Sequence, residues 1–230
     1  MKSKLFMMIL PVVFAVAANA QEIITAESYL KSVSERYAGI RDYEAQVVIR
    51  SGSSEMTGRL SYLTPSFLRI IFSRPYGQEI LFNGETMSVY LPEYRAVLNQ
   101  SITPSRRSAA TLASGEGLSL LSRNYVSSFV VGPGPVPLEG TQEQVIQIRL
   151  TRRSISEGFR EIILSINPNT KLIRRIQGRT IAEGLVQFDF YSVQTNLGIP
   201  MSRFQVDSLE SASARASAYV YNNFLFRDTE

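Results

Sequence analysis

The segment from Leu63 to Pro92 constrains the fold more than any other part of the chain. It contains apolar runs, prolines near both ends and an Asn-Gly pair in its middle. Asn83-Gly84 lies between the apolar runs Glu79–Phe82 and Thr86–Leu91. It predicts a hairpin with a type I′ turn, which needs positive φ at both central residues. With Leu68–Phe72 as the preceding run, the segment predicts three consecutive antiparallel strands that share one apolar face.

Composition excludes several kinds of chemistry. The 230 residues include no cysteine, histidine or tryptophan, so cysteine nucleophiles, Ser-His triads and Cys/His zinc sites are impossible. Any catalysis would rest on carboxylate, lysine, serine or tyrosine side chains. The carboxylates that stand in strands or turns occur singly, without the pairing that acid/base catalysis needs. We therefore expect no enzyme, no catalytic residue, no cofactor and no metal. These carboxylates are Glu44, Glu79, Glu85, Asp189 and Asp207.

The N-terminus has the pattern of a cleaved export signal. Lys2 and Lys4 precede the apolar stretch Leu5–Ala17, which is too short to span a membrane, and Ala18-Asn19-Ala20 fits a cleavage site. We expect residues 1–20 to be removed, leaving one soluble exported domain over residues 21–230 with no lipid anchor. Without the two signal lysines the formal charge is about +2, with no basic block that would suggest nucleic acid.

The rest of the chain predicts many strands and few helices. Thr25 can cap an amphipathic helix over Ala26–Ala38. About six strands follow, of which Tyr43–Arg50 and Glu55–Leu63 alternate most clearly. A Ser/Ala/Gly-rich connection over Ser101–Glu116 leads to a short helix at about Gly117–Tyr125.

Four to six further strands are expected after this second helix, with Arg203–Val206 and Ala218–Phe226 as the last ones. Because long helices do not alternate with the strands, the pattern favours one long antiparallel sheet over a parallel α/β arrangement. A sheet of this length must curl strongly. We expect a mainly β (α+β) fold in which the N-terminal helix and the short mid-chain helix cover the concave face.

The order of signals around the Asn-Gly pair resembles LolA-type periplasmic carriers of outer-membrane lipoproteins. The resemblance rests on a strand before Pro65, a proline at position 75, the Asn83-Gly84 turn and Val89-Tyr90-Leu91-Pro92. It implies an incomplete β-barrel whose cavity holds acyl chains of lipoproteins or lipids. It further implies a soluble, monomeric periplasmic protein. Such a protein would meet an inner-membrane release transporter and an outer-membrane acceptor, with transient membrane contact.

Alternation of the strands gives the wall of such a cavity. The side chains on one face are apolar, although an ordinary packed core would show the same pattern. The expected lining is Val47, Ile49, Met56, Leu60, Tyr62, Leu68, Ile70, Phe72, Ile80, Phe82, Met87 and Val89. We expect Leu30 and Val33 on the first helix, with Leu118 and Leu121 on the second, to form a lid over them.

The sequence also departs from the resembled family and leaves alternatives open. Thr64 stands where the family has a basic residue that helps to hold the lid closed, which suggests a lid held by apolar packing alone. A lipid- or lipoprotein-sensing regulatory module of the same fold, which binds a protein partner, is the alternative function. The basic residues of the second half suggest a patch for acidic partners or membrane headgroups, or simply solvated strand faces. They are Arg149, Arg152, Arg153, Arg160, Arg174 and Arg175.

Overall fold

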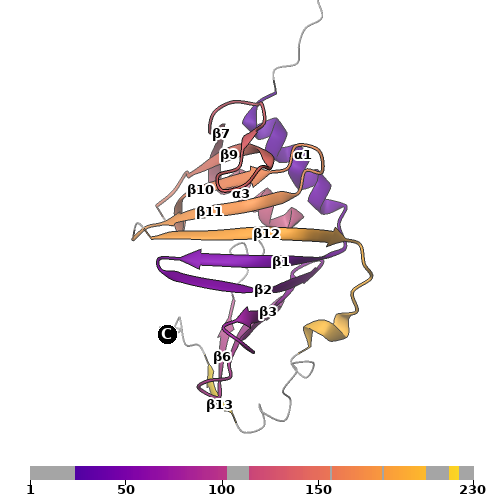
Figure 1. Ribbon diagram of the computed structural model, residues 1–230, viewed down its shortest axis with the longest axis vertical. Helices are drawn as coiled ribbons and strands as arrows, with labels where there is room; N and C mark the ends of the chain where they lie inside the picture. The colour runs from indigo at the N-terminus through magenta and orange to yellow at the C-terminus, as the bar shows by residue number, and fades with distance from the viewer. Residues whose placement is uncertain (1–23, 103–113, 156, 183, 206–217, 223–230) are drawn as a thin grey trace, which may run out of the picture.

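A single curved sheet dominates the computed structural model, which describes residues 24–102, 114–155, 157–182, 184–205 and 218–222. The described strands follow the order β13-β6-β5-β4-β3-β2-β1-β12-β11-β10-β9-β7, and β8 pairs with β9 off this path. Because β13 and β7 at the two ends do not pair with each other, the sheet is an incomplete barrel, as expected (Figure 1). The expected export signal, residues 1–20, lies outside the described residues.

The sheet consists of two meanders that meet where β1 pairs with β12. The first meander contains β1 (Asp42–Ser51), β2 (Ser54–Leu63), β3 (Phe67–Arg74), β4 (Glu79–Asn83), β5 (Thr86–Leu91) and β6 (Ala96–Ser101). The second contains β7 (Tyr125–Phe129), β8 (Val136–Pro137), β9 (Gln144–Arg152), β10 (Phe159–Ile166), β11 (Ile173–Thr180) and β12 (Leu185–Thr195). The short β13 (Tyr219–Asn222) joins the edge at β6.

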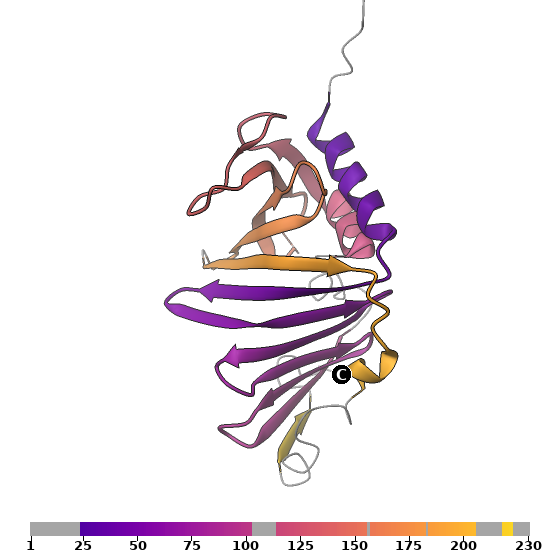
Figure 2. The same cartoon turned by 45° about the vertical axis from the view of Figure 1, so that its right-hand side comes forward.

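Two helices lie together against the inner face of the second meander, and Figure 2 shows both on that side of the sheet. Helix α1 (Ala26–Ala38) begins at the predicted residue, because Thr25 and Ser28 cap each other reciprocally. Helix α3 (Gly115–Asn124) begins after Ser114, whose hydroxyl accepts the N–H of Gly117. The helices and the inner sheet residues form one continuous apolar core that includes Leu30, Val33 and Leu118.

The outer face of the sheet carries two separate covers. Between β12 and the 3-10 helix η2 (Met201–Phe204) the chain turns back across β3 and β4. There Phe204 and Ile199 pack on Leu81 and form a small second core. Asp42 anchors this crossing, since its carboxylate accepts the N–H groups of Leu197 and Gly198 at 2.6 and 3.1 Å. The second cover is the segment 130–143, whose Leu138 is buried.

Three expectations about local structure are wrong. Only Gly84 of the Asn-Gly pair has positive φ, so the turn is not type I′; Asn83 ends β4, and its side-chain oxygen accepts the N–H groups of Glu85 and Thr86. Instead of a strand over Arg203–Val206, the chain forms η2, which Pro200 precedes. Strand β13 pairs parallel to β6 and not antiparallel, because Tyr219, its first residue, lies beside Ala96, the first residue of β6.

The structure also contains a strand that the sequence patterns did not indicate. The strand β7 follows α3 directly at Tyr125, where the second helix was expected to end. Most of the connection over Ser101–Glu116 lies outside the described residues.

Candidate functional site

The expected cavity wall lies on one face of five neighbouring strands. Most of the wall residues are direct cross-strand partners of one another. Ile49 pairs with Met56; Leu60 pairs with Ile70, Ile70 with Ile80 and Ile80 with Val89; Tyr62 pairs with Leu68, Leu68 with Phe82 and Phe82 with Met87. Val47 and Phe72 flank Gly58 in the same row. Because side chains of direct partners point to the same side of a sheet, the register brings all twelve predicted residues onto the inner face.

The twelve residues differ in burial along the sheet. Those nearest the helices belong to the main core, and Val47 and Phe72 are almost fully buried. The inner side chains of Ile80, Met87 and Val89 on β4 and β5, near the edge at β6, are only half-buried, as are Met56 on β2 and Leu68 on β3. Phe82, at 1% exposure, is the exception among the wall residues of β4 and β5. The inner face therefore passes from a packed core into an apolar surface that the described helices do not fully cover.

The four predicted lid residues are all buried. Leu30 and Val33 on α1, and Leu118 and Leu121 on α3, join the core that contains the inner side chains of β9, β10 and β11. The helices thus pack mainly on the second meander, whereas most of the predicted wall belongs to the first.

Polar contacts also hold the helices in place. Within the core, the Tyr37 hydroxyl accepts the backbone N–H of Ile173 at 3.0 Å. Burial raises the pKa of Tyr37 to about 12, so the hydroxyl keeps its proton at neutral pH. The Ser34 hydroxyl donates to the Gly115 carbonyl at 3.3 Å, and the ammonium group of Lys171 lies 3.8 Å from the ring centroid of Tyr29. The expectation of apolar packing alone, drawn from Thr64, is therefore wrong.

Arg174 and Arg175 do not form an exposed basic patch. Asp189 on β12 is completely buried, and its carboxylate accepts bonds from Arg175 at 2.6 Å, Arg50 at 2.7 Å and Gln187 at 2.6 Å. Arg174 bonds Glu143 at 2.7 Å and stacks over the ring of Tyr191. These groups lie on the outer face beneath the segment 130–143, so the network joins the covering segment to the sheet.

Two further carboxylates that stand alone in the sequence also have arginine partners. Glu79 pairs with Arg69 at 3.1 Å in a buried position, and Glu44 pairs with Arg203 of η2. Asp207 lies outside the described residues. Sequence reasoning missed these pairs, although a lone acidic residue between apolar neighbours in a strand, such as Asp189 between Phe188 and Phe190, is a usable signal for a buried pair.

A groove of about 710 Å³ lies on the outer face between the two covers. Ile71, Tyr76 and Tyr191 supply its largest apolar and aromatic side chains, and Gln46, Thr57 and Arg59 contribute polar groups. Arg59 also borders a smaller hollow of about 240 Å³ near Ser192, where β12 has a bulge. No expectation from the sequence had pointed to this groove.

Across the described ranges, acidic side chains do not gather in groups of three or more that could hold a metal ion. Within the same ranges, every helix is too short or too polar to cross a membrane.

Comparison with protein families identifies a sequence relationship. The family model described as LolA, outer membrane lipoprotein carrier protein, matches residues 45–207. This match spans the whole predicted wall, both outer covers and α3. Among curated proteins, no sequence matches the chain.

Solved structures share the fold at low sequence identity. An uncharacterised conserved protein from Thermus thermophilus superimposes with a TM-score of 0.53 and 12% identity, covering 86% of this chain and 98% of that one. The structure of MucB gives a TM-score of 0.50 and 16% identity, covering 80% of this chain and 63% of MucB. A lipoprotein-sorting protein domain from Vibrio parahaemolyticus gives 0.48 and 12%, covering 80% and 97%.

Proposed function

Because the chain belongs to the LolA family of outer membrane lipoprotein carrier proteins, we propose that it carries acyl chains of lipoproteins or lipids on the inner face of its sheet. In this proposal the exported protein acts in the periplasm and moves its cargo between the inner and outer membranes. A release transporter would load it and an outer-membrane acceptor would unload it. The observation that carries the proposal is the half-buried apolar surface beyond the helices.

The physical need for such a surface follows from the cost of exposing acyl chains to water. Each buried methylene is worth roughly 0.8 kcal/mol, so a 16-carbon chain in water costs on the order of 10 kcal/mol. Met56, Leu68, Ile80, Met87 and Val89 offer apolar surface without directional bonds, and methionine adapts to chains of different shape. A surface of this kind binds acyl chains firmly enough to carry them and still releases them to an acceptor.

The matched isoleucines Ile80 and Ile71 provide a test. Both are half-buried and lie on neighbouring strands, but Ile80 faces inward and Ile71 faces the outer groove. The protein is purified from an exporting host, bound lipid is measured by mass spectrometry, and extraction of a triacylated lipoprotein from membranes is assayed. Burying a polar amide costs about 1 to 3 kcal/mol, so we expect Ile80→Asn to lower lipid binding about 5- to 150-fold.

Ile71→Asn is the control and should retain binding within about twofold, because it does not face the cargo. A wild-type protein that is empty and extracts no lipoprotein would contradict the carrier proposal. Equal loss of lipid binding in both variants would also count against it, because binding would then not depend on the inner face of the sheet.

The outer groove favours a second candidate function, that of a regulatory module that binds a protein partner. Two tyrosines, Tyr76 and Tyr191, line the groove, and tyrosine is enriched among the residues that contribute most of the binding energy at protein interfaces. This function predicts the reverse result: Ile71→Asn would abolish capture of a periplasmic partner, and Ile80→Asn would not.

A further inference from the structure

The hairpin turns at one end of the sheet share a composition that the cargo surface does not explain. Cross-strand partners place the β1–β2, β3–β4, β5–β6, β9–β10 and β11–β12 turns at this end. Ser51 pairs with Val186, Thr57 with Arg74, and Phe159 with Thr180. A Cβ added at Gly77 would lie 3.4 Å from Pro92, so the β3–β4 and β5–β6 turns are in contact. Figure 2 shows the β1–β2, β3–β4 and β11–β12 turns along the left side of the sheet.

Four of these five turns present a large apolar side chain to solvent. Tyr76 in the β3–β4 turn is 90% exposed, Tyr94 in the β5–β6 turn 69%, Ile155 in the β9–β10 turn 83% and Ile181 in the β11–β12 turn 56%. Single exposed apolar residues are ordinary on a protein surface. What points to an interaction site here is their recurrence on four turns at the same end of one sheet.

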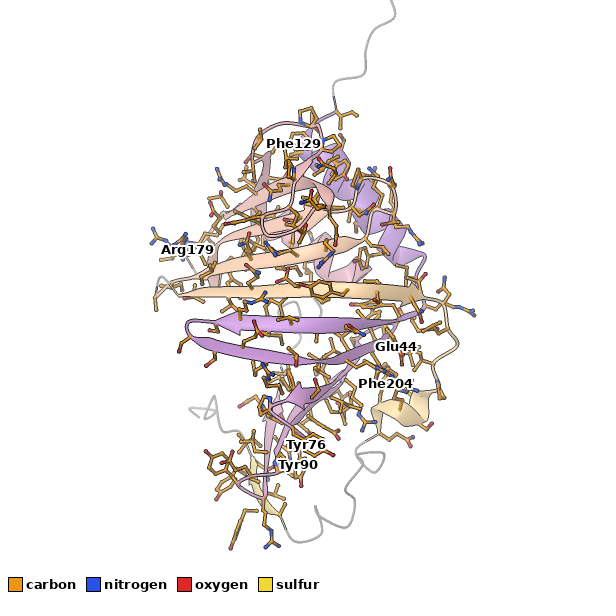
Figure 3. All side chains as sticks on the ribbon, viewed as in Figure 1. Glu44, Tyr76, Tyr90, Phe129, Arg179 and Phe204 are labelled. Carbon is orange, nitrogen blue, oxygen red and sulfur yellow. The ribbon has the colours of Figure 1, made fainter. Side chains whose placement is uncertain are left out.

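An arginine accompanies each of these side chains. Arg74 lies two residues before Tyr76, Arg153 two before Ile155 and Arg179 two before Ile181, while Arg95 follows Tyr94. Arg74, Arg153 and Arg179 are exposed and form no ion pair with any residue that the structure describes. Figure 3 shows Arg179 at the left end of the sheet. The described acidic residues at this end are Glu55, Glu79, Glu93, Glu157 and Glu161. Glu55 is paired with Arg50 at 2.8 Å, Glu79 with Arg69 at 3.1 Å and Glu161 with Arg149 at 3.1 Å.

We propose that these turns form a docking rim for an anionic lipid bilayer surface, in which the apolar tips enter the interface and the arginines bind lipid phosphates. Tyrosine suits the boundary between headgroups and acyl chains, and arginine can reach phosphates while its aliphatic stem contacts apolar surface. This inference concerns a surface separate from the cargo face and does not depend on what that face carries.

The spacing of the apolar groups favours a bilayer over a protein. Protein interfaces concentrate their energy in a few aromatic or arginine anchors that fill pockets near the centre of a contiguous patch. Here one apolar group stands on each turn along a curved edge, with polar chain between them. A bilayer offers both an apolar interior and phosphates at any spacing, so binding to it does not require the turns to match pockets at fixed distances.

The test measures flotation of the protein, purified from an exporting host, with lipid vesicles. Wild-type protein should float with vesicles that contain phosphatidylglycerol and not with pure phosphatidylcholine, and salt should weaken binding. The triple variant Arg74→Gln, Arg153→Gln, Arg179→Gln removes three charges, each worth about fivefold near an anionic surface. We expect its affinity to fall on the order of 100-fold. Tyr94→Ser combined with Ile155→Ser and Ile181→Ser should also lower flotation, although salt should affect it as in the wild type.

Matched controls come from the opposite end of the molecule. Val131 and Leu197 are also exposed apolar residues, and Arg36 and Arg41 are exposed arginines. Val131→Ser with Leu197→Ser, and Arg36→Gln with Arg41→Gln, should float like the wild type. Because all substituted side chains are exposed, circular dichroism should show an unchanged fold in every variant.

A single tryptophan gives an independent readout, since the chain contains none. In Tyr94→Trp the emission should shift to shorter wavelength when phosphatidylglycerol vesicles are added, whereas in Val131→Trp it should not. Wild-type protein that fails to float with phosphatidylglycerol vesicles at low salt would overturn the proposal. Equal flotation of rim variants and wild type, or equal loss in the controls, would overturn it as well.

Discussion

Replacing Asp189 by alanine would leave the guanidinium group of Arg175 inside the protein without its carboxylate. Asp189 is fully buried, the Arg175 side chain is 9% exposed, and their charged atoms lie 2.6 Å apart. Loss of one member of a buried ion pair costs about 3 to 5 kcal/mol, because the remaining charge is uncompensated. Arg50, a second partner, is 42% exposed and also pairs with Glu55, so solvent screens its contribution. Arg174 lies 4.0 Å from the same carboxylate but keeps its pair with Glu143 at 2.7 Å. We therefore expect Asp189→Ala to lower the free energy of unfolding by about 3 kcal/mol.

Urea unfolding followed by circular dichroism measures this change, and a double-mutant cycle isolates the pair. Arg175→Leu with Asp189→Leu removes both charges, and we expect a coupling energy of at least about 2 kcal/mol. Glu161→Ala is the control, since its pair with Arg149 is about one-third exposed and should be worth less than about 1 kcal/mol. The reasoning is refuted if Asp189→Ala costs less than about 1 kcal/mol or if the two leucine substitutions are additive.

Three further predictions concern the core and its pH dependence. Gly58→Ala would place a Cβ 2.5 Å from the Ile71 carbonyl oxygen, so it should lower the free energy of unfolding by about 1 to 3 kcal/mol. Gly132→Ala is the control, because its Cβ would meet no atom within 4 Å, and it should change the free energy of unfolding by less than about 0.5 kcal/mol. Urea unfolding midpoints compare the two variants. Tyr37→Phe leaves the buried N–H of Ile173 without an acceptor and should cost about 1 to 3 kcal/mol in the same assay. Because the folded pKa of Tyr37 is about 12 and its ordinary value 10.0, wild-type stability should fall as pH rises above about 10, and less so in Tyr37→Phe. An equal decline in both proteins between pH 8 and 11.5 would contradict this assignment.

The elements that were predicted correctly have sequence signals that lie within a short stretch of the chain. Helix α1 was predicted to the residue because its capping pair and its 3.6-residue period both lie within the helix. Strand β5 was predicted with its observed bounds, since alternation from Met87 to Leu91 follows a clear turn. Strand β7 was missed because Tyr125–Phe129 is short and directly follows a helix, so no turn signal separates the two.

The remaining features depend on contacts between distant parts of the chain. Alternation placed the wall residues on one face but could not show that α1 and α3 cover mainly the second meander. Arg174 was expected on the outer face of its strand, and it lies there. Its burial was not expected, because it depends on the segment 130–143, which covers it. The parallel pairing of β13 with β6 depends on a return of the chain that no periodicity reports.

The junction of β1 with β12 determines the order in which the molecule can assemble. Neighbouring strands within each meander are close in sequence, but this junction joins positions such as Arg50 and Asp189, which are 139 residues apart. Closing so long a loop is entropically costly, and its contacts must wait until the second meander exists. Helix α1 precedes β1 directly, yet it packs against β7 and β11, where Tyr29 contacts Phe129 and Tyr37 accepts the Ile173 N–H. The first helix to be synthesised is therefore among the last to be buried, and its apolar side stays accessible while the second half of the chain is still being made.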